Sequence, residues 1–423
     1  MNLLIALHHI TLIDGTGRDP VPDATVGVRD GKIMYAGTSK TWLPSHQEDI
    51  LNMDFTGKFL LPGLIDCHVQ LARSGEAHGR VDGDDGAVAL RMLQNARRNL
   101  AAGITTVRDL GGWNELEFGV REAIQRGDFC GPRLVLTGRS ISGSDAAARQ
   151  YPGRYRRITG PDEVRKAARE AFRRGADALE LGMTGSLLVQ DDVAVAKQLS
   201  TEEIGAAVDE ATKAERRVAA HAHGIEGIRQ AAAAGVHTIE HGTFLHKGRD
   251  VVEDMRTRGT FLVPTLNAGR VLAEGGTSRV PAWMLERLND TYESAKKSTR
   301  LAYQAGVQVA MGSNAGTPLN KHGENGLGVL SLHQAGMKAM DALLAATSTA
   351  ARALGLDSQL GSIEEGKLAD LLVLDSNPLE DLSRLADKRL IRAVFLEGRL
   401  VARQPTDAYP KTMFTRDNLL IGI

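Results

Sequence analysis

VAAHAHGIEGIRQAAAAGVHTIEHG, residues 218–242, contains one full unit of the pattern that decides the fold. It begins with the short apolar run Val218–His221, which is typical of a buried strand. Apolar residues then recur at helical spacing over 225–232, and Gly235 follows where the helix should end. A second apolar run, Val236–Ile239, completes the unit. A strand, a helix and a further strand in this order predict parallel neighbours in one sheet.

The same unit repeats through the middle of the chain. A capping box of Ser200 and Glu203 marks the start of one of its helices. The apolar runs that we interpret as strands are Leu60–Cys67, Ile104–Val107, Arg133–Leu136, Ala178–Leu181, Val218–His221, Val236–Ile239, Phe261–Thr265 and Val307–Met311. Eight strands that alternate with helices predict an α/β protein with a closed (β/α)8 TIM barrel. A doubly wound open sheet is the structural alternative.

The two chain ends have a different pattern, in which short β-like runs are joined by turns. Asp14-Gly15 is a hairpin signal near the start, and strand-like runs recur after residue 368. We expect residues 1–58 and 362–423 to form a small β-sandwich domain, and residues 59–361 to form the barrel.

The composition is that of an ordinary globular protein and excludes several classes of partner. Of 423 residues, 51 are basic and 52 are acidic, so the net charge of −1 favours neither nucleic acid nor a membrane surface. The first apolar run lacks a basic region and a cleavage site, which argues against a signal peptide, and no apolar stretch is long enough to span a membrane. With only two cysteines, Cys67 and Cys130, we expect a cytoplasmic protein.

Polar side chains stand at the carboxyl ends of several predicted strands, which meet at one mouth in such a barrel. His68 and Gln70 follow the first strand on the same side of it. The other strands contribute Glu180, His221, His241 and Asn314. A buried carboxylate needs a partner, and a divalent cation is a partner that imidazoles also bind. Spacing alone leaves other interpretations open: structural histidines, and an ion pair between Glu180 and an arginine.

Ordered motifs extend over nearly the whole chain: Leu61–His68, Gly103–Asp109, His221–Gly224, Ile239–Gly242 and Gly361–Leu371. They resemble signatures of the amidohydrolase superfamily, in its imidazolonepropionase- and prolidase-like branch. The resemblance implies a metal-dependent hydrolase that cleaves a C–N bond of the amide, carbamate or urea type in a small-molecule substrate with a metal-activated water. It also implies a homo-oligomer, because oligomers are common among similar enzymes.

The sequence departs from that family at three positions, and the departures change the expected metal site. Gln70 stands where the family has a second histidine, Glu180 where it has a carboxylated lysine, and Asn314 where it has an aspartate. The resemblance therefore implies one divalent ion instead of two. We expect Zn²⁺, with Mn²⁺ or Co²⁺ as alternatives, and the expected ligands are Glu180, His221 and His241.

The replacement by Asn314 also leaves the proton acceptor unassigned, because an amide is not a base. His68 is our first candidate, and we expect it and Asn314 to be the catalytic residues. His223 and Glu240 are weaker candidates for the base, since strand alternation turns Glu240 away from the site. Without a strong base, activated substrates such as aryl carbamates, anilides and ureas fit best.

The loops after the strands are expected to select the substrate. We expect Gln70, Met183 and His223 to contact it. The loop 139–157 is rich in arginine and tyrosine, and its arginines either hold a carboxylate or are simply solvated. Two other functions stay open: a catalytically inactive binding or scaffold protein on the same fold, and a deaminase or lactonase that uses the same site.

Overall fold

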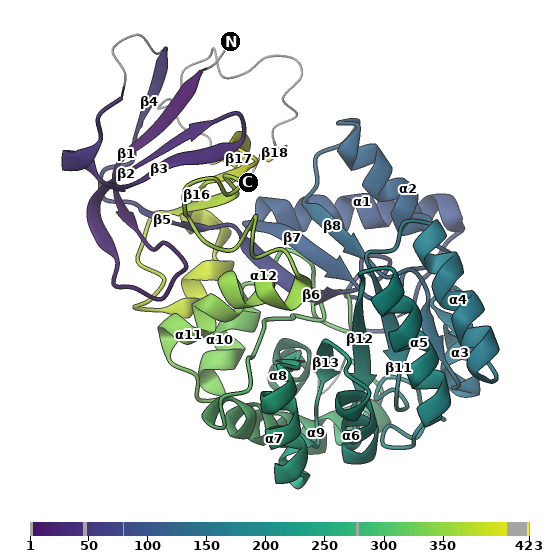
Figure 1. The fold of residues 1–423 in the computed structure, drawn as a ribbon. Helices are drawn as coiled ribbons and strands as arrows, with labels where there is room; N and C mark the ends of the chain where they lie inside the picture. Colours follow the sequence, from purple (N-terminus) through teal and green to yellow (C-terminus); the bar gives the residue numbers. More distant parts are fainter. Residues whose placement is uncertain (1–2, 45–48, 79, 276–278, 404–420, 423) are drawn as a thin grey trace.

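The computed structural model describes residues 3–44, 49–78, 80–275, 279–403 and 421–422 (Figure 1). The last part of the predicted C-terminal domain, beyond residue 403, lies almost entirely outside these residues. No helix among the described residues is long and apolar enough to cross a membrane.

Strands from both chain ends form one nine-stranded sheet, seen at the upper left of Figure 1. Its order is β18-β17-β16-β15-β5-β1-β2-β3, and β4 pairs with β1. The antiparallel pairing of β15 with β5 joins the C-terminal strands to the N-terminal ones. The strands are β1 (Leu4–Leu12), β2 (Val21–Arg29), β3 (Lys32–Thr38), β4 (Ile50–Asp54), β5 (Phe59–Pro62), β15 (Leu371–Leu374), β16 (Ile391–Leu396), β17 (Arg399–Arg403) and β18 (Ile421–Gly422).

The middle of the chain forms two further sheets in which every pairing is parallel. One has the order β6-β7-β8, with β6 (Leu64–Val69), β7 (Ile104–Asp109) and β8 (Arg133–Leu136). The other has the order β10-β9-β11-β12-β13-β14, with β9 (Ser140–Ser142), β10 (Tyr155–Arg157), β11 (Ala178–Gly182), β12 (Arg217–Ala222), β13 (Thr238–His241) and β14 (Phe261–Val263). This arrangement gives the α/β class that the alternating pattern predicts.

Hydrogen bonds connect the edges of these two parallel sheets. On one side, the Asp177 N–H, just before β11, donates to the Leu136 carbonyl of β8 over 2.7 Å. On the other side, residues 307–315 bond to β14 through Leu262 and to β6 through Cys67. We predicted a strand over Val307–Met311, but the structure has only one isolated bridge there, between Val309 and Leu262. The reason is that the Met311 N–H bonds to a carbonyl outside the sheets, that of Ala345, so no continuous ladder forms.

The predicted first strand, Leu60–Cys67, is divided in the structure between two sheets. Its first part is β5 of the end sheet and its second part is β6 of a parallel sheet, with Gly63 between them. A Cβ atom on Gly63 would lie 2.3 Å from Thr105 Oγ1, so only glycine permits this close approach of the backbone to β7.

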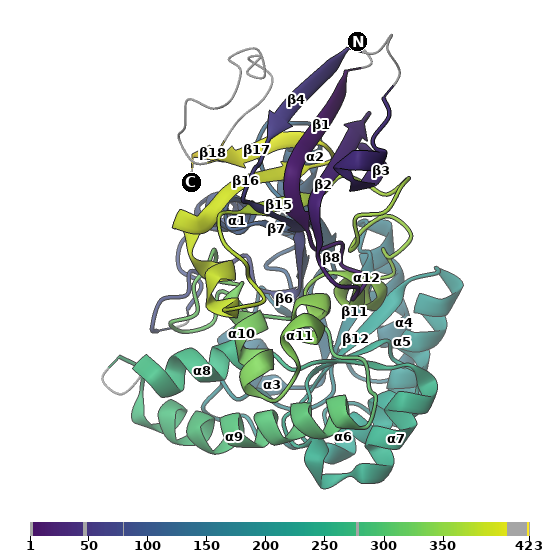
Figure 2. The ribbon, with the colours of Figure 1, turned by 90° about the vertical axis from the view of Figure 1, so that its left-hand side faces the viewer.

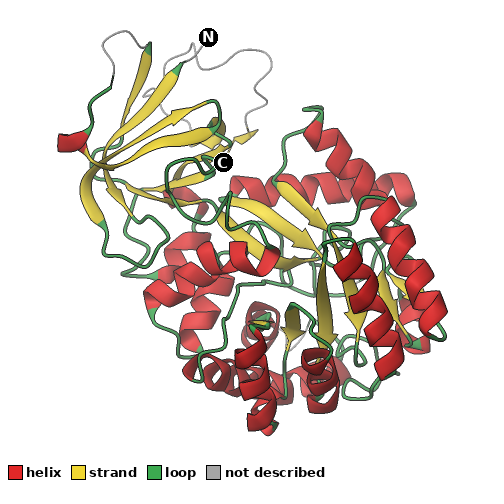
Figure 3. Cartoon of the chain, viewed as in Figure 1, coloured by secondary structure: helices red, strands yellow, loops and turns green. Residues whose placement is uncertain are grey.

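Helices surround the parallel strands, as the red elements of Figure 3 show. The predicted capping box is confirmed, because the Ser200 hydroxyl accepts from the Glu203 N–H and the Glu203 carboxylate accepts from the Ser200 N–H. The helices are α1 (Asp85–Ala101), α2 (Leu116–Gln125), α3 (Asp145–Gln150), α4 (Pro161–Arg173), α5 (Thr201–Lys213), α6 (Ile225–Ala233), α7 (Arg249–Arg258), α8 (Leu266–Gly275), α9 (Ala282–Gln304), α10 (Leu327–Gln334), α11 (Ala339–Ala345) and α12 (Ser348–Leu354).

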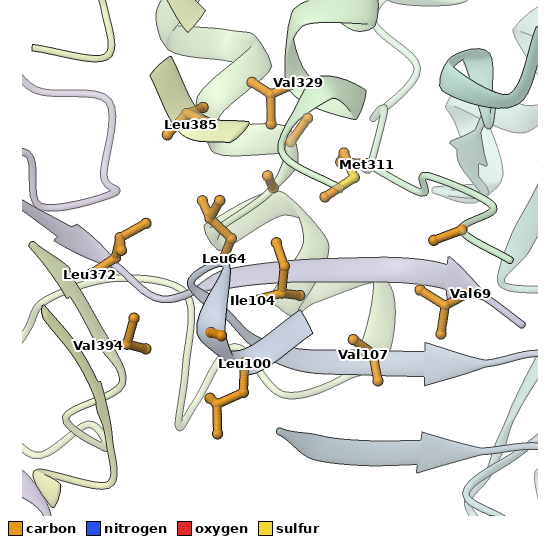
Figure 4. Close-up of a cluster of buried hydrophobic side chains, with 14 of the residues drawn as sticks. Leu64, Val69, Leu100, Ile104, Val107, Met311, Val329, Leu372, Leu385 and Val394 are labelled. Atoms are coloured by element: carbon orange, nitrogen blue, oxygen red, sulfur yellow. The ribbon is translucent and has the colours of Figure 1, made fainter. Parts of the chain in front are cut away.

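A buried hydrophobic cluster joins the end sheet to the helix-covered part of the molecule (Figure 4). Leu64 and Ile104 of the parallel strands and Leu100 of α1 lie in the same cluster as Leu372 of β15 and Val394 of β16. Figure 2 shows the end sheet above this junction and helices α8 and α9 at the far end of the molecule. Because the burial is shared, the end sheet is held firmly against the strands that carry the site.

Candidate functional site

Two histidines of the site lie at the carboxyl ends of adjacent parallel strands, His221 on β12 and His241 on β13. The backbone of His241 has φ 69°, which is left-handed. Consecutive side chains can therefore both reach the interior, and Glu240 contacts His68 there over 2.8 Å. Our expectation that alternation turns Glu240 away from the site is wrong for this reason.

His221, His223 and His241 form a cluster in which one ring nitrogen from each lies within 4.8 Å of the others. His241 Nε2 and His221 Nδ1 are 2.8 Å apart, and the rings of His223 and His241 are stacked. Their Nδ1 atoms bond to hydroxyls over 2.7 Å, His223 to Thr243 and His241 to Thr265. Burial lowers the pKa of all three histidines, so the rings are neutral near neutral pH.

These three residues fit a single transition-metal ion. A neutral imidazole is the form that binds a metal, and a hydrogen bond at the second ring nitrogen fixes the ring's orientation. His68 adds a further donor next to the cluster. Its ring centre is 5.0 Å from that of His241, and its buried Nε2 atom has no hydrogen-bond partner among the described residues.

A buried ion pair holds His68 from the other side. His68 Nδ1 bonds to one carboxylate oxygen of Glu240, and Arg108 Nη2 donates to the other over 2.6 Å. Arg108 Nε also donates to the Cys67 carbonyl over 2.7 Å. Although burial opposes it, the Arg108 charge and the His68 hydrogen bond lower the pKa of Glu240, which is ionised. The geometry leaves Nε2 as the ring nitrogen available for a proton or a ligand.

Two amide side chains belong to the site. Gln70 follows β6, and Asn314 lies in the segment 307–315. Gln70 Nε2 donates to Asn314 Oδ1 over 2.9 Å, and Arg73 Nη1 donates to Gln70 Oε1 over the same distance. Asn314 has φ 56°, a left-handed conformation that asparagine adopts more readily than most residues. The two neutral amides and the Arg73 guanidinium thus form a hydrogen-bonded row next to the histidine cluster.

Glu180 of β11 forms an ion pair with Arg154, which precedes β10. Arg154 Nη2 lies 3.3 and 3.5 Å from the two carboxylate oxygens. Arg154 Nη1 donates to the carbonyls of Leu110 and Gly111 over 2.6 and 3.1 Å. Burial opposes the charge of Arg154, yet the Glu180 carboxylate raises the pKa of Arg154 above its ordinary value. This is the pairing with an arginine that spacing alone left open.

A cavity opens over the histidine cluster. Its empty volume, open mouth included, is about 800 Å³, which is in the range of small-molecule sites. Of the residues predicted for the site, those that line it are Gln70, His221, His223, His241 and Asn314.

Three predicted site residues are not among the residues that line the cavity. His68 and Glu180 lie buried beside those that do, in contact with Glu240 and Arg154. Met183 belongs to the hydrophobic core behind β11. The structure thus brings the predicted histidines and amides together, but it does not place Met183 where a substrate would contact it.

Sequence reasoning missed several side chains that complete the site. Thr265 ends the predicted seventh strand, so the search for polar strand ends could have found it. Thr243 lies two residues after His241 and could have been found in the same way. Arg73 and Arg108 carry no signal in the sequence, because their roles depend on contacts between elements that are distant in the chain.

Curated relatives cover most of the chain. The Aspergillus niger ochratoxinase is 28% identical over an alignment of 419 positions that covers 92% of this chain and 85% of that protein. The imidazolonepropionase of Porphyromonas gingivalis is 26% identical over 412 residues, with 89% of each chain covered.

Solved structures and a family model agree with these relatives. A crystal structure of a Xaa-Pro dipeptidase with bound methionine is similar with a TM-score of 0.84 at 30% identity, and the match covers 94% of this chain and 99% of that one. The crystal structure of the A. niger ochratoxinase has a TM-score of 0.86 at 24% identity, covers 99% of this chain and 100% of that one, and supports the fold alone. The model of the Amidohydrolase family matches residues 59–401, which confirms the resemblance found in the sequence motifs. This chain belongs to the Amidohydrolase family.

Proposed function

We propose that this protein is a metal-dependent hydrolase that cleaves a C–N bond of the amide, carbamate or urea type in a small molecule. The observation that carries the proposal is the cluster of three neutral histidine rings at the ends of parallel strands, beneath a cavity. Membership of the Amidohydrolase family and the hydrolases among its relatives support it.

The proposal includes the architecture that positions this cluster. We infer that the two parallel sheets and the segment 307–315 close into a (β/α)8 barrel over residues 59–361. The hydrogen bonds of Asp177 and Leu262 at the sheet edges support this closure. Residues 1–58 and 362–423 would then form the small β domain. The sheet of this domain also includes strand β5, whose four residues belong to the range 59–361 that we assign to the barrel.

We propose one divalent ion at the histidine cluster, with Zn²⁺ expected and Mn²⁺ or Co²⁺ as alternatives. His221 and His241 are the ligands that the sequence and the geometry both favour. Glu180 is the third predicted ligand and would have to exchange Arg154 for the ion, whereas His223 already lies within the cluster. A divalent ion held there supplies Lewis-acid chemistry, since it polarises a carbonyl and makes water more acidic.

The chain's own side chains would handle the proton and orient the substrate. His68 would accept the proton at Nε2, while its Nδ1 atom stays bonded to the Glu240 carboxylate. Asn314 and Gln70 would donate or accept hydrogen bonds to the substrate from the cavity wall. Since His68 is buried beneath that wall, its general-base catalysis would give only a modest rate enhancement. Substrates with good leaving groups, such as aryl carbamates and anilides, would therefore suit the site.

The test combines metal content with turnover of an aryl carbamate and an anilide. We expect about one tightly bound ion per chain and hydrolysis that a chelator abolishes and Zn²⁺ restores. His221→Ala should lose both the ion and the activity. His9→Asn, at an exposed histidine in the end sheet, should keep both. A protein that retains hydrolysis after complete metal removal would refute the proposal.

A second function, a binding protein without hydrolysis, has one specific observation in its favour. Gln70 bonds to Asn314, and Glu180 bonds to Arg154, so these groups are satisfied within the protein. A chain that binds no metal and has no hydrolytic activity would support this alternative. We also propose a cytoplasmic homo-oligomer, which size-exclusion chromatography with light scattering and localisation of the tagged protein would test.

A further inference from the structure

A second cavity adjoins the one over the histidine cluster. Its empty volume, open mouth included, is about 1090 Å³, and its lining includes Trp113, Tyr151, Leu188, Trp283 and Met284. We call it the aromatic pocket. Tyr151 and Leu188 also line the first cavity, so the two cavities meet at these two side chains.

The aromatic pocket gathers side chains that are rare in this chain. Aromatic residues make up only 4% of the sequence, yet two of its three tryptophans line this one pocket. Trp113 and Tyr151 belong to one apolar cluster, and Leu188 and Trp283 belong to another with Met284. The pocket thus takes a tryptophan from each of two clusters. Tryptophan and tyrosine offer large, rigid contact surfaces to a ligand.

Two of the rings are held in place by groups next to them. A Cβ atom on Gly153 would lie 2.6 Å from Trp113 Cδ2, so the indole packs directly on the glycine backbone. The guanidinium of Arg73 lies 5.1 Å from the centre of the Tyr151 ring. Rings that are fixed before binding lose little entropy when a ligand arrives.

Arg287 of α9 holds the side of the pocket that Trp283 forms. Its guanidinium carbon lies 5.3 Å from the centre of the Trp283 ring. Nη1 donates to the Val189 carbonyl over 2.8 Å, and Nη2 donates to the Gln190 carbonyl over 3.1 Å. The start of α9 and the loop after β11 are therefore tied together, which keeps the Trp283 ring and Leu188 on the same pocket.

Charge does not dominate the aromatic pocket. Apart from His78, the charged side chains among the described residues that line it are Arg80 and Asp82, one of each sign. Both residues are exposed, so solvent and salt screen them. The pocket therefore suits a neutral group, and its rings suit a planar aromatic one that can stack on them or meet them edge to face.

We propose that the aromatic pocket binds a planar aromatic group of a small molecule, against Trp113, Tyr151 and Trp283. Because Tyr151 and Leu188 line both cavities, one molecule can occupy both, with its aromatic group in the pocket and its reacting bond above the histidines. The position of the reacting bond rests on the proposed function, whereas the binding of the aromatic group does not depend on it. The proposal makes Trp113 and Trp283 determinants of specificity.

The test uses two neutral probes with the same carbon skeleton, naphthalene-2-methanol, which is flat, and decahydronaphthalene-2-methanol, which is saturated and puckered. Their affinities for the full chain are measured by isothermal titration calorimetry with a chelator present, so that no turnover occurs. We expect the flat probe to bind roughly tenfold more tightly, because stacking on rings favours a planar partner. Trp113→Leu and Trp283→Leu should each weaken its binding by roughly three- to tenfold.

Fluorine NMR of the protein labelled with 5-fluorotryptophan locates the bound probe. The chain has three tryptophans, so three signals are expected, and single Trp→Phe variants assign them. We expect the signals of Trp113 and Trp283 to shift together as the flat probe is added, with one dissociation constant. The signal of Trp42, which packs against Tyr35 of the end sheet, should not move.

Trp42→Leu is the matched control and should leave both affinities unchanged. Circular dichroism confirms that each variant is folded. Equal affinity for the two probes, no shift of the Trp113 and Trp283 signals at millimolar concentrations of the flat probe, or full affinity in either leucine variant of these two residues would overturn the inference. Failure of the proposed function has a different signature, since the metal-loaded protein would then hydrolyse no substrate while the two signals still shift with the probe.

Discussion

At the scale of single residues, the site depends on a few buried contacts that local sequence does not reveal. The sequence predicts His221, His241 and Asn314 as site residues, because polar residues at the ends of apolar runs are easily recognised. It does not predict the side chains with which these residues interact. Arg154 arrives from a distant loop to pair with Glu180, and the left-handed backbone of His241 brings Glu240 inside.

The third ligand of the proposed ion can be identified with two substitutions. If Glu180 is a ligand, Glu180→Gln should lower the affinity for Zn²⁺ by about tenfold or more, since a neutral amide is a poor ligand. If His223 is the ligand instead, His223→Ala should have that effect and Glu180→Gln should not. Competition with a fluorescent zinc chelator measures both. The sequence-based prediction is the first result, and unchanged affinity in Glu180→Gln would contradict it.

Removal of one partner of the Glu240–Arg108 pair should destabilise the fold strongly, because both side chains are buried and the remaining charge would have no solvent to screen it. Glu240→Gln leaves the Arg108 charge without a counter-charge, and we expect a loss of about 3–5 kcal/mol in the free energy of unfolding. Urea denaturation measures it. The double variant Glu240→Gln with Arg108→Met removes the stranded charge and should recover part of the loss. If Glu240→Gln were as stable as the wild type, Arg108 would not need the Glu240 carboxylate as its counter-charge.

Glu117 of α2 should make stability depend on pH. Burial raises its pKa from 4.5 to about 8, and both carboxylate oxygens lack a hydrogen-bond partner among the described residues. The folded state therefore holds a proton that the unfolded state releases, so stability is lost as the pH rises from 4.5 towards about 8. Glu117→Gln stays neutral and should weaken this loss by on the order of 1.4 kcal/mol for each unit of the pKa shift.

Urea denaturation at a series of pH values checks this prediction for Glu117. The variant and the wild type should be similarly stable in acid and should diverge with increasing pH. Glu122→Gln, on an exposed part of the same helix, is the control and should have the pH dependence of the wild type. Parallel curves for Glu117→Gln and the wild type would contradict the assignment.

At the scale of elements, the sequence predicted the repeating strand–helix unit well, because many of its helices have an apolar stripe and a glycine shortly after the last turn. The Ser200–Glu203 capping box is a local signal of this kind, and the structure confirms it. The errors arose where pairing is not local. The run Leu60–Cys67 divides between two sheets at Gly63, and Val307–Met311 bonds partly outside the sheets. Loop 139–157 contains β9, α3 and β10, which its polar composition concealed.

The turn after β7 should tolerate no side chain at Gly111. A Cβ atom there would lie 2.5 Å from Arg154 Cζ, and the backbone has φ 68°. Gly111→Ala should therefore cost more than the usual penalty of about 1–2 kcal/mol for a left-handed alanine, and it should displace Arg154. Gly127→Ala is the matched control, since Gly127 has φ 81° but nothing within 4 Å of its Cβ position. Thermal unfolding compares the two, and equal losses would contradict the close packing.

At the scale of the whole molecule, the order of the elements and the family follow from the sequence, whereas the way in which the parts meet does not. The pairing of β5 with β15 joins residues more than 300 positions apart, and only their apolar character is visible locally. Arg133 of β8 bonds to Asp370 and Glu397 of the C-terminal part, which strengthens the same junction. The end sheet is therefore anchored to the parallel strands by both apolar packing and ion pairs.

The central claim is that one divalent ion binds where β12 and β13 end. Anomalous diffraction at the zinc absorption edge, from crystals grown with Zn²⁺, tests it most directly. The account predicts one strong peak within coordination distance of the ring nitrogens of His221 and His241. No peak at those two rings, or occupancy only at surface histidines, would contradict it.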